Sequence, residues 1–419
     1  MPAPRPVCFI RKMSKSLKRS LLVIVIWLLI LGGGWFGLRY VHRQSIDHQV
    51  AELEASVRFG HSGETDEIAE VLPMETLAGY TDRYANASAG YYAAKLTGSE
   101  LVTYRSVLYA MDHSYDYVEL PAGIITADRV LQCVSFASLD HALLEENSVV
   151  DLGSATLVVG DRELKRHYLK FSGFTAERLA KKEQAYAAAQ KIVAELPAGT
   201  GEETARRLFD WVAEHIAYTQ AEDYNNSDPH YLYDAFMNSS SNCDGISNAY
   251  TLLMNLAGME CFNVIDDPAE GEEGHTWNIL KLNGVYFQAD STAEAGLYAL
   301  VGQSCGISFA RSAEAIGNGP YHPWLAEAAP ACGDTSRDAV GMDVYFKSRE
   351  PGNAEKRALR NAVEELEYGA KIRIFCCAEF PLITEQQRLE LVKEWIRPCY
   401  VDLRLYTAGD RYCILCRDQ

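Results

Sequence analysis

The chain has 419 residues, 48% of them apolar and 23% charged, and its formal net charge is −18. This length allows two or three domains with buried cores, and the balance of residues is that of globular domains, which excludes a low-complexity chain. The first 43 residues hold eight of the 39 basic residues and none of the 57 acidic ones, so the remaining body is strongly acidic. Such a surface repels nucleic acid and anionic lipid. The acidic surface favours solubility. Attraction to basic or cationic cell-wall substrates is the alternative interpretation.

An uncharged apolar run, LLVIVIWLLILGGGWFGL, occupies residues 21–38 and is long enough to span a bilayer. Six basic residues precede it and two follow it. The positive-inside rule therefore places the basic segment 1–20 in the cytoplasm and the body outside. A cleavable signal peptide is the alternative, but its apolar region usually has about 7 to 15 residues and ends at a small-residue site that residues 32–34 match poorly. Cys8 precedes the run, so it is not a lipid-bearing cysteine exposed by cleavage.

The segment after this run has little regular pattern. Residues 39–96 are polar with weak helical periodicity, which predicts a stalk or an irregular segment. Residues 97–175 predict a small helical α+β module, because apolar positions recur at helical spacing before two short β-like stretches. We expect helices at 97–111 and 127–146, and strands at 148–152 and 155–159.

Two more helices are expected at 176–196 and 203–216, separated by the turn-forming PAGTG stretch. The last segment, residues 336–419, alternates strand and helix candidates, which favours a compact α/β domain. Its strands are expected at 343–347, 371–377, 401–406 and 411–416, and its helices at 354–369 and 385–396. Nothing in this segment indicates chemistry.

Eleven cysteines are too few for a disulfide scaffold in a chain of this length, although an exported body permits bridges. Cys305 and Cys332 form one candidate pair, and members of the C-terminal group form others. That group comprises Cys376, Cys377, Cys399, Cys413 and Cys416. Cys413 and Cys416 have a metal-like C-x-x-C spacing, but strand alternation sends these two thiols to opposite faces. Strand packing or disulfide pairing is therefore favoured over zinc.

One cysteine stands at a predicted helix start. In SSNCDGISNAYTLLMNLAG, Asn242 or Ser241 is a natural N-cap, apolar residues then follow a helical period, and Gly258 is the expected stop. The unpaired N–H groups and positive dipole end at such a position favour thiolate over thiol. Cys243 is therefore a candidate nucleophile, and Gly245 would let a substrate backbone approach closely. A small buried hydrophobe is the alternative interpretation of the thiol.

The following stretch, GHTWNILKLNGVYFQADST, predicts a β-hairpin with Asn283-Gly284 as a two-residue type I′ turn. In that register, His275 and Asp290 are diagonal neighbours on one face, about 7 to 8 Å apart at the backbone. A carboxylate can therefore reach the imidazole. Singly, His275 can be a surface residue and Asp290 a turn residue before a capping box of Ser291 and Glu294.

Together, these residues provide a complete set for nucleophilic catalysis. The chemistry requires a thiol, a base that takes its proton, and an acceptor that fixes the tautomer of the base. Cys243, His275 and Asp290 supply these three groups in that order.

Residues 200–292 resemble the transglutaminase-like superfamily, in the bacterial branch with a Cys-[DE]-Gly motif. The resemblance rests on YDAFMNSSSNCDGISNAYTLLMNLAGMEC followed by HTWNILKLNGVYFQADST. It implies a papain-like α+β core, here assigned to residues 176–335, in which Cys243 is the nucleophile, His275 the base and Asp290 the orienting acid. Residues 97–170 more weakly resemble the helical segment that often precedes this core, although a Pro-Glu pair expected near Asp140-His141 is absent.

The resemblance also suggests roles for neighbours of the triad. Tyr233 matches a position that is often aromatic and can bind substrate or the oxyanion, although packing over the helix is the favoured interpretation. Trp277 should shield the His-Asp contact from water, and we include it with Tyr233 and Gly245 among candidate substrate-binding residues. Asn278 lies on the other strand face and is expected to be structural. The resemblance implies no metal or other cofactor.

The expected activity is attack of a thiolate on an amide carbonyl of a peptide, protein or cell-wall substrate through an acyl-enzyme. Hydrolysis is favoured over protein cross-linking, because nothing in the chain resembles the dedicated acceptor or calcium sites of cross-linking enzymes. A non-catalytic module that binds peptides or cell-wall polymer is the alternative of another class. Peptidoglycan-cutting thiol peptidases share a similar helix start, but their third group is commonly His, whereas this chain offers Asp290.

Overall fold

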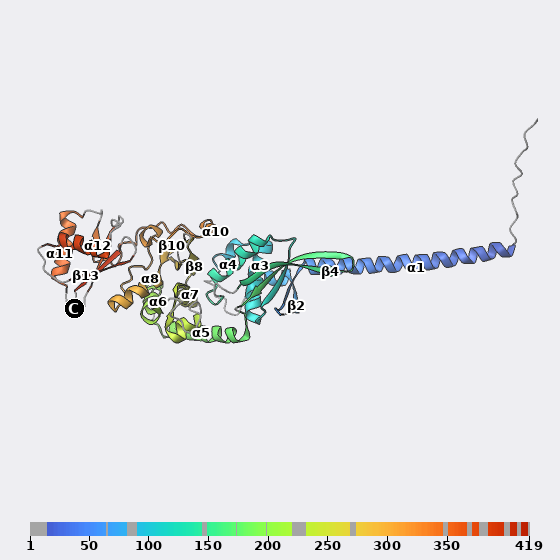
Figure 1. Ribbon diagram of the computed structural model, residues 1–419, viewed down its shortest axis with the longest axis horizontal. Coiled ribbons are helices and arrows are strands. Elements are labelled where there is room, and N and C mark those ends of the chain that lie inside the picture. The colour runs from blue at the N-terminus through green and yellow to red at the C-terminus, as the bar shows by residue number, and fades with distance from the viewer. Residues whose placement is uncertain are drawn as a thin grey trace, which may run out of the picture.

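The chain forms an elongated molecule in which a long helix leads into three successive globular parts (Figure 1). The computed structural model describes residues 15–63, 66–81, 90–144, 149–172, 174–197, 199–219, 232–268, 274–346, 351–366, 371–376, 384–397, 403–408 and 412–417. The first globular part contains a five-stranded sheet, the middle part a three-stranded sheet, and the last part a four-stranded sheet.

Helix α1 (Lys15–Glu54) contains the apolar run 21–38 and continues to the first sheet without a break (Figure 1). Residues 39–54, predicted as a stalk or irregular segment, are therefore helical. The side chains of residues 15–25, 28 and 36 lie outside the described part of the chain. Among the residues that are described, no helix has both the length and the apolarity needed to cross a membrane.

The first globular part begins earlier than predicted and contains more strand than helix. Its antiparallel sheet has the order β2-β1-β3-β5-β4. The strands are β1 (Ser56–His61), β2 (Glu67–Pro73), β3 (Tyr117–Pro121), β4 (Val149–Val159) and β5 (Arg162–Phe171). The expectation that residues 39–96 lack regular structure was wrong, because β1 pairs with the distant β3 as well as with β2. Local sequence does not reveal such a pairing.

Two predicted helices pack in this first part, α3 (Gly98–His113) and α4 (Ala127–Asp140), beside the short α2 (Met74–Ala78) and the 3-10 turn η1 (Ala93–Lys95). Helix α4 ends six residues earlier than predicted, and the two short strands expected at 148–152 and 155–159 form the single strand β4. The module is thus a sheet with helices rather than a mainly helical unit.

Arg166 joins the end of α1 to this sheet. Its guanidinium donates to the carbonyl oxygens of Leu53, Ser56 and Glu119 at 2.8, 2.9 and 3.0 Å, and the side chain is only 1% exposed. The contact with Leu53 satisfies a carbonyl in the last turn of α1, which has no partner within the helix itself. The helix is therefore held rigidly against the module rather than tethered by a loose linker.

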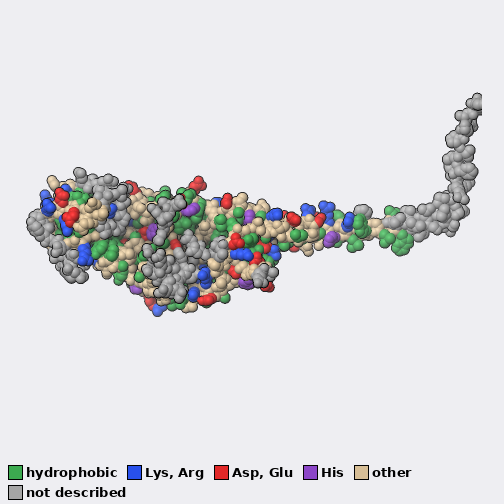
Figure 2. Space-filling view, in the orientation of Figure 1, with side chains coloured by type: hydrophobic (Ala, Val, Ile, Leu, Met, Phe, Trp, Pro, Cys, Tyr) green, Lys and Arg blue, Asp and Glu red, His purple; other side chains and the backbone are tan. Residues whose placement is uncertain are grey.

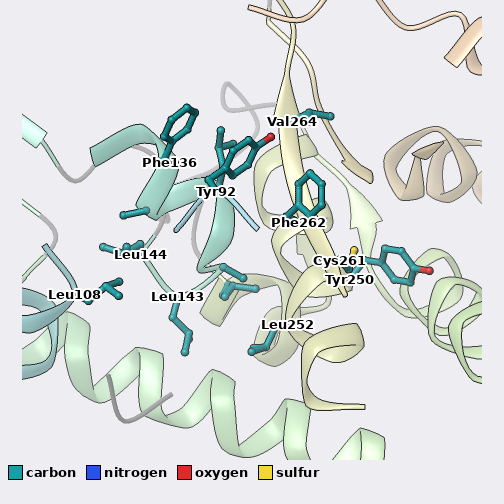
Figure 3. Packing of buried hydrophobic residues seen from close by; sticks show 14 of the residues in the cluster. Tyr92, Leu108, Phe136, Leu143, Leu144, Tyr250, Leu252, Cys261, Phe262 and Val264 are labelled. Atoms are coloured by element: carbon teal, nitrogen blue, oxygen red, sulfur yellow. The ribbon is translucent and has the colours of Figure 1, made fainter. Parts of the chain in front are cut away.

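Aromatic rings join the first and middle parts. Tyr92 stacks on Phe136 of α4 with ring centroids 4.8 Å apart and meets the edge of Phe262 in the middle sheet at 5.3 Å (Figure 3). The buried Asp140 carboxylate accepts the N–H groups of Tyr92 and Ala93 at 3.0 and 2.9 Å, which fixes this turn. One continuous apolar core therefore runs from the first module into the middle part.

The middle part contains α5 (Ala176–Glu195) and α6 (Gly201–His215), close to their predicted bounds. They surround α7 (Cys243–Leu256), which packs on a sheet of order β10-β9-β8. Those strands are β8 (Cys261–Ile265), β9 (Thr276–Leu282) and β10 (Val285–Ala289), followed by α8 (Ser291–Val301). Shorter elements are β6 (Ala217–Tyr218), the π-helix η4 (Asp234–Asn238), β7 (Ser240–Ser241), α9 (Ala313–Ile316) and α10 (Pro323–Ala326). This arrangement confirms the predicted mixed helix-and-sheet core.

The C-terminal part confirms the predicted alternation of strands and helices. Its sheet has the order β11-β12-β14-β13. The elements are β11 (Val344–Phe346), α11 (Asn353–Glu364), β12 (Lys371–Cys376), α12 (Glu385–Trp395), β13 (Leu403–Ala408) and β14 (Tyr412–Arg417).

The cysteines test two further expectations. Cys332 carries a buried free thiol, so the candidate bridge between Cys305 and Cys332 does not form. Cys413 lies within the C-terminal core, whereas the alternate strand positions, such as Ile414, face a second apolar cluster with Leu297. Cys416 stands two positions after Ile414 and is therefore on the same face of the strand. The two thiols lie on opposite faces, as predicted. Cys377, Cys399 and the side chain of Cys376 lie outside the described residues.

Candidate active site

The β9–β10 hairpin has the predicted register. Leu282 pairs with Val285, and the pairing continues to Asn278 with Ala289. Asn283 and Gly284 have φ values of 51° and 84°, the positive values that a type I′ turn requires at both central positions. The turn therefore fixes which residues of the two strands lie opposite each other, and it brings the residues just beyond the strand ends together.

Cys243 is the first residue of α7, as predicted. The Asn242 side chain caps the helix by accepting the N–H groups of Asp244 and Gly245 at 3.1 and 3.2 Å. The Cys243 thiol is half-buried at the positive end of the helix dipole. Because Cys243 is the first residue of α7, its backbone N–H has no acceptor within the helix itself.

His275 lies between Cys243 and Asp290. Its Nε2 atom is 2.8 Å from Asp290 Oδ2, and the Cys243 side chain lies near enough to the ring to raise its pKa. Because Asp290 occupies Nε2, the other ring nitrogen, Nδ1, is left for the thiol. The His275 side chain is 29% exposed and that of Asp290 only 4%, so the carboxylate lies behind the ring and away from solvent.

Electrostatics favour a charged imidazole at this position. Burial lowers the pKa of His275, but the Asp290 carboxylate and the Cys243 side chain raise it by more than burial lowers it. The resulting pKa is about 10. Burial raises the pKa of Asp290, but the charge of His275 and the hydrogen bonds from His275, Ala293 and Asn318 hold it below its ordinary value. The site therefore stabilises an imidazolium between a carboxylate and a thiol.

The two carboxylate oxygens of Asp290 have different hydrogen-bond partners. Oδ1 accepts the N–H of Ala293 at 2.8 Å and caps α8, whereas Oδ2 accepts His275 and the Asn318 amide at 2.8 and 3.0 Å. The N-cap of α8 is thus Asp290, and the expected capping box of Ser291 and Glu294 does not form. Because both oxygens are engaged, the carboxylate has one fixed orientation toward the imidazole.

Asp244 and Thr276 connect the nucleophile to the base. Each follows a catalytic candidate in the chain, and the Thr276 hydroxyl donates to Asp244 Oδ1. The Ser247 hydroxyl adds a second link by donating to the Thr276 carbonyl oxygen at 2.9 Å. These contacts hold the first turn of α7 against the first residue of β9, so they fix the position of Cys243 relative to His275.

A buried amide extends this link. Asn278 is fully buried, and its Nδ2 donates to Ser247 O, Thr251 Oγ1 and Asn263 Oδ1 at 2.9, 3.0 and 2.9 Å. Its Oδ1 accepts from Ser291, the residue after Asp290, at 3.2 Å. The predicted structural role of Asn278 is therefore confirmed, since it joins α7, β8, β9 and the start of α8.

Sequence reasoning missed two residues that hold His275 and Asp290. Asp266 Oδ1 accepts the backbone N–H of His275 at 2.7 Å, and Asn318 approaches Asp290 from the loop after α9. Asn318 stands 28 residues from Asp290, and no local pattern connects the two. Asp266 lies in the acidic segment before His275, which the sequence alone indicated only as a loop.

The other candidate residues lie in different environments. Trp277 is fully buried and stacks behind His275 with ring centroids 5.7 Å apart, which fits the shielding role and leaves no surface for a substrate. Tyr233 is half-buried beside η4, with Lys181 of α5 5.8 Å from its ring centroid. Gly245 is buried in the first turn of α7. The proposed substrate contacts of Tyr233 and Gly245 remain predictions.

Comparison with known proteins finds similarities in the middle part of the chain. Residues 186–291 match the model of the transglutaminase-like superfamily. Human kyphoscoliosis peptidase is 29% identical over 114 residues, which cover 24% of this chain and 17% of that protein's length. A solved putative cysteine protease from Cytophaga hutchinsonii has 7% identity over 35% of this chain and 64% of its own, with a TM-score of 0.21. The periplasmic domain of TgpA from Pseudomonas aeruginosa has 11% identity over 44% and 71% of the two chains, with a TM-score of 0.22.

The link between Asp244 and Thr276 predicts a loss of thiol reactivity on its removal. Thr276→Val keeps the side-chain shape but leaves the buried Asp244 without the hydroxyl donor, so alkylation of Cys243 by iodoacetamide at neutral pH should slow about five- to tenfold, the value of one buried hydrogen bond. The rate is measured by mass spectrometry of the Cys243 peptide.

Thr292→Val is the matched control, because Thr292 is also buried near Asp290 but its hydroxyl has no partner in the described structure. This variant should react as fast as wild type. Equal slowing in both valine variants would show that the link does not position the thiol.

Proposed function

Because residues 186–291 form a transglutaminase-like core, we propose that the protein is a thiol enzyme that attacks peptide or protein amide bonds and forms an acyl-enzyme on Cys243. The observation that carries this proposal is His275 held between the Cys243 side chain and Asp290, with Nε2 2.8 Å from the carboxylate. A nucleophile, a base and an orienting acid within hydrogen-bond reach form the general arrangement for nucleophilic catalysis.

In the proposed reaction, the Cys243 thiolate attacks the amide carbonyl carbon, and the carbonyl electrons move to the oxygen. We assign the backbone N–H of Cys243, at the first position of α7, as a donor to this oxyanion. The His275 imidazolium then gives its proton to the leaving amine as the C–N bond breaks, which leaves a thioester on Cys243. The Asp290 carboxylate keeps the imidazole oriented and stabilises its charged form throughout.

The second half of the reaction depends on the acceptor. Water that gives its proton to His275 attacks the thioester, the C–S bond breaks, and the Cys243 thiolate leaves, which yields a free acid. The protein is then a peptidase or amidase. An amine in the same position yields a new amide, which is cross-linking. We favour hydrolysis, because the matched human relative is named a peptidase and nothing in this chain resembles dedicated acceptor or calcium sites.

We further propose that α1 anchors the enzyme in the cell membrane, with the N-terminus in the cytoplasm and the catalytic body outside. The basic bias around residues 21–38 supports this, as do large apolar side chains that α1 exposes, including Trp27, Leu31 and Leu38 at 58%, 63% and 73%. Figure 2 shows hydrophobic side chains on the surface of this helix. Residues 39–54 would then extend about 24 Å beyond the span at 1.5 Å per residue. Arg166 would keep the active site at a fixed distance from the bilayer.

This topology predicts the pattern of protease digestion in intact cells. Externally added protease should degrade the body after Tyr40 and spare the first 20 residues, as detected with an N-terminal epitope tag. Complete recovery of the full chain in a soluble cytosolic fraction would refute the anchor.

The catalytic proposal predicts an order of losses along the triad. Cys243→Ala should abolish amide turnover and His275→Ala should nearly abolish it, because proton transfer to the leaving amine has no substitute. Asp290→Asn should be milder than the loss of about 10⁴ seen for a serine triad, because the helix end favours the thiolate independently.

Turnover of a peptide mixture, with and without an amine donor, is measured by mass spectrometry of the acyl products. If the products contain the amine, the reaction is cross-linking and not hydrolysis. Equal turnover by wild type and Cys243→Ala would eliminate the thiol mechanism, and the non-catalytic binding module would then be the better account.

The electrostatics of His275 predict the alkaline limit of activity. Leaving-group protonation requires imidazolium, so kcat/KM should fall as pH rises through the raised pKa of His275, about 10 against an ordinary 6.5. Asp290→Asn removes the charge that contributes most to raising this pKa, so its alkaline limb should move to lower pH. A pH–rate profile of both proteins measures the shift, and coincident alkaline limbs would contradict the assigned role of Asp290.

A further inference from the structure

A second polar hollow lies away from Cys243, between the start of α6 and the segments around residues 306–311 and 337–341. Its volume is about 490 Å³, within the range of small-molecule sites. Four arginines and two glutamates line it: Arg206, Arg207, Arg311, Arg337, Glu202 and Glu203. In a chain with a net charge of −18, this local excess of guanidinium groups is unusual.

The two glutamates already have partners. Glu202 accepts hydrogen bonds from both terminal nitrogens of Arg337 at 3.0 and 2.5 Å. Glu203 forms the capping box of α6 with Thr200. The Nε atom of Arg337 is buried without an acceptor among the described residues. The carboxylates of Glu202 and Glu203 are therefore already engaged in contacts of their own.

Arg311 is the most deeply buried of the lining arginines. Its guanidinium is 2% exposed and donates only to backbone carbonyls, including Ile307 O at 2.8 Å and Gly306 O at 2.9 Å. Burial lowers the pKa of Arg311, although Tyr412, Asp338 and Glu294 act in the opposite direction.

The Arg206 guanidinium is fixed by contacts on one edge and one face. Asp210 accepts its Nε at 2.8 Å, and Phe309 lies against its guanidinium at 5.7 Å. Gly306, with φ of 63°, leaves the space that the guanidinium occupies, and a Cβ at this position would collide with it. The two terminal nitrogens of Arg206 donate to no group among the described residues, so they remain as a preoriented pair of donors.

We propose that this hollow binds an oxyanion, the phosphate or carboxylate group of a small molecule, with Arg206 as the principal ligand-binding residue. The planar guanidinium fork matches both anions and binds them through paired charge-assisted hydrogen bonds. The adjacent guanidinium groups add electrostatic attraction for the anion. This attraction is screened less by water because Arg311 and Arg337 are largely buried. This site is separate from the proposed catalytic centre and shares no lining residue with it.

The site also contacts two other parts of the molecule. Arg311 lies 5.5 Å from the ring of Tyr412 in the C-terminal domain, and it exchanges two backbone hydrogen bonds of 2.8 Å with Gln288 of β10. A bound anion would therefore stabilise the segment that joins the catalytic core to the C-terminal domain.

Calorimetric titration of the full chain tests the proposal, with inorganic phosphate and citrate as probes at constant ionic strength. Wild type should bind at least one of them saturably with one site per chain, and the preferred probe indicates a phosphate or a polycarboxylate ligand. Arg206→Gln should weaken binding about tenfold or more, the value of one charge-assisted hydrogen bond. Arg162→Gln should bind as wild type, because Arg162 is an exposed residue of β5 paired with Asp47.

Arg207→Gln provides a second lining variant if Arg206→Gln fails to fold, as judged from its thermal midpoint without anion, and it should also weaken binding. Absence of saturable binding of both probes to wild type would overturn the proposal. Unchanged affinity in the folded lining variant would overturn it equally.

Discussion

The register of the β9–β10 hairpin is the constraint on which the proposed catalytic centre depends. A two-residue turn at Asn283-Gly284 fixes the pairing of every position up to the strand ends. A slip of one residue would send alternate side chains to the opposite face. His275 would then lose Asp290, and the buried Asn278 would lose its contacts with α7. The turn thus determines both the internal order of the core and the hydrogen bond between base and acid.

Buried polar groups extend that constraint from the hairpin to the nucleophile. Asp244 and Ser247 of α7 bind the hydroxyl and the carbonyl of Thr276, and Asp290 uses one oxygen for α8 and the other for His275. Burying carboxylates costs free energy unless each has hydrogen-bond partners. Here the partners are the elements that carry the catalytic candidates, so the same contacts that satisfy the carboxylates also position the site.

Features set by local sequence were predictable, and features set by distant contacts were not. The cap at Asn242, the start of α7 at Cys243 and the hairpin turn each depend on a few neighbouring residues, so their patterns predicted these elements correctly. Strands β1 and β2 were missed because β1 depends on its pairing with β3, about sixty residues away in a register that no short pattern encodes. Asn318 was missed for the same reason, since it reaches Asp290 from a remote loop.

The central claim is that the Cys243 thiolate forms an acyl-enzyme with the help of His275. The most direct test is to mix the protein with an activated ester of an N-acylated amino acid, stop the reaction in acid, and map the modified peptide by mass spectrometry. The account predicts one acyl group on Cys243 in wild type and little in His275→Ala. An acyl group on another residue, or equal labelling of Cys243 in both proteins, would contradict it.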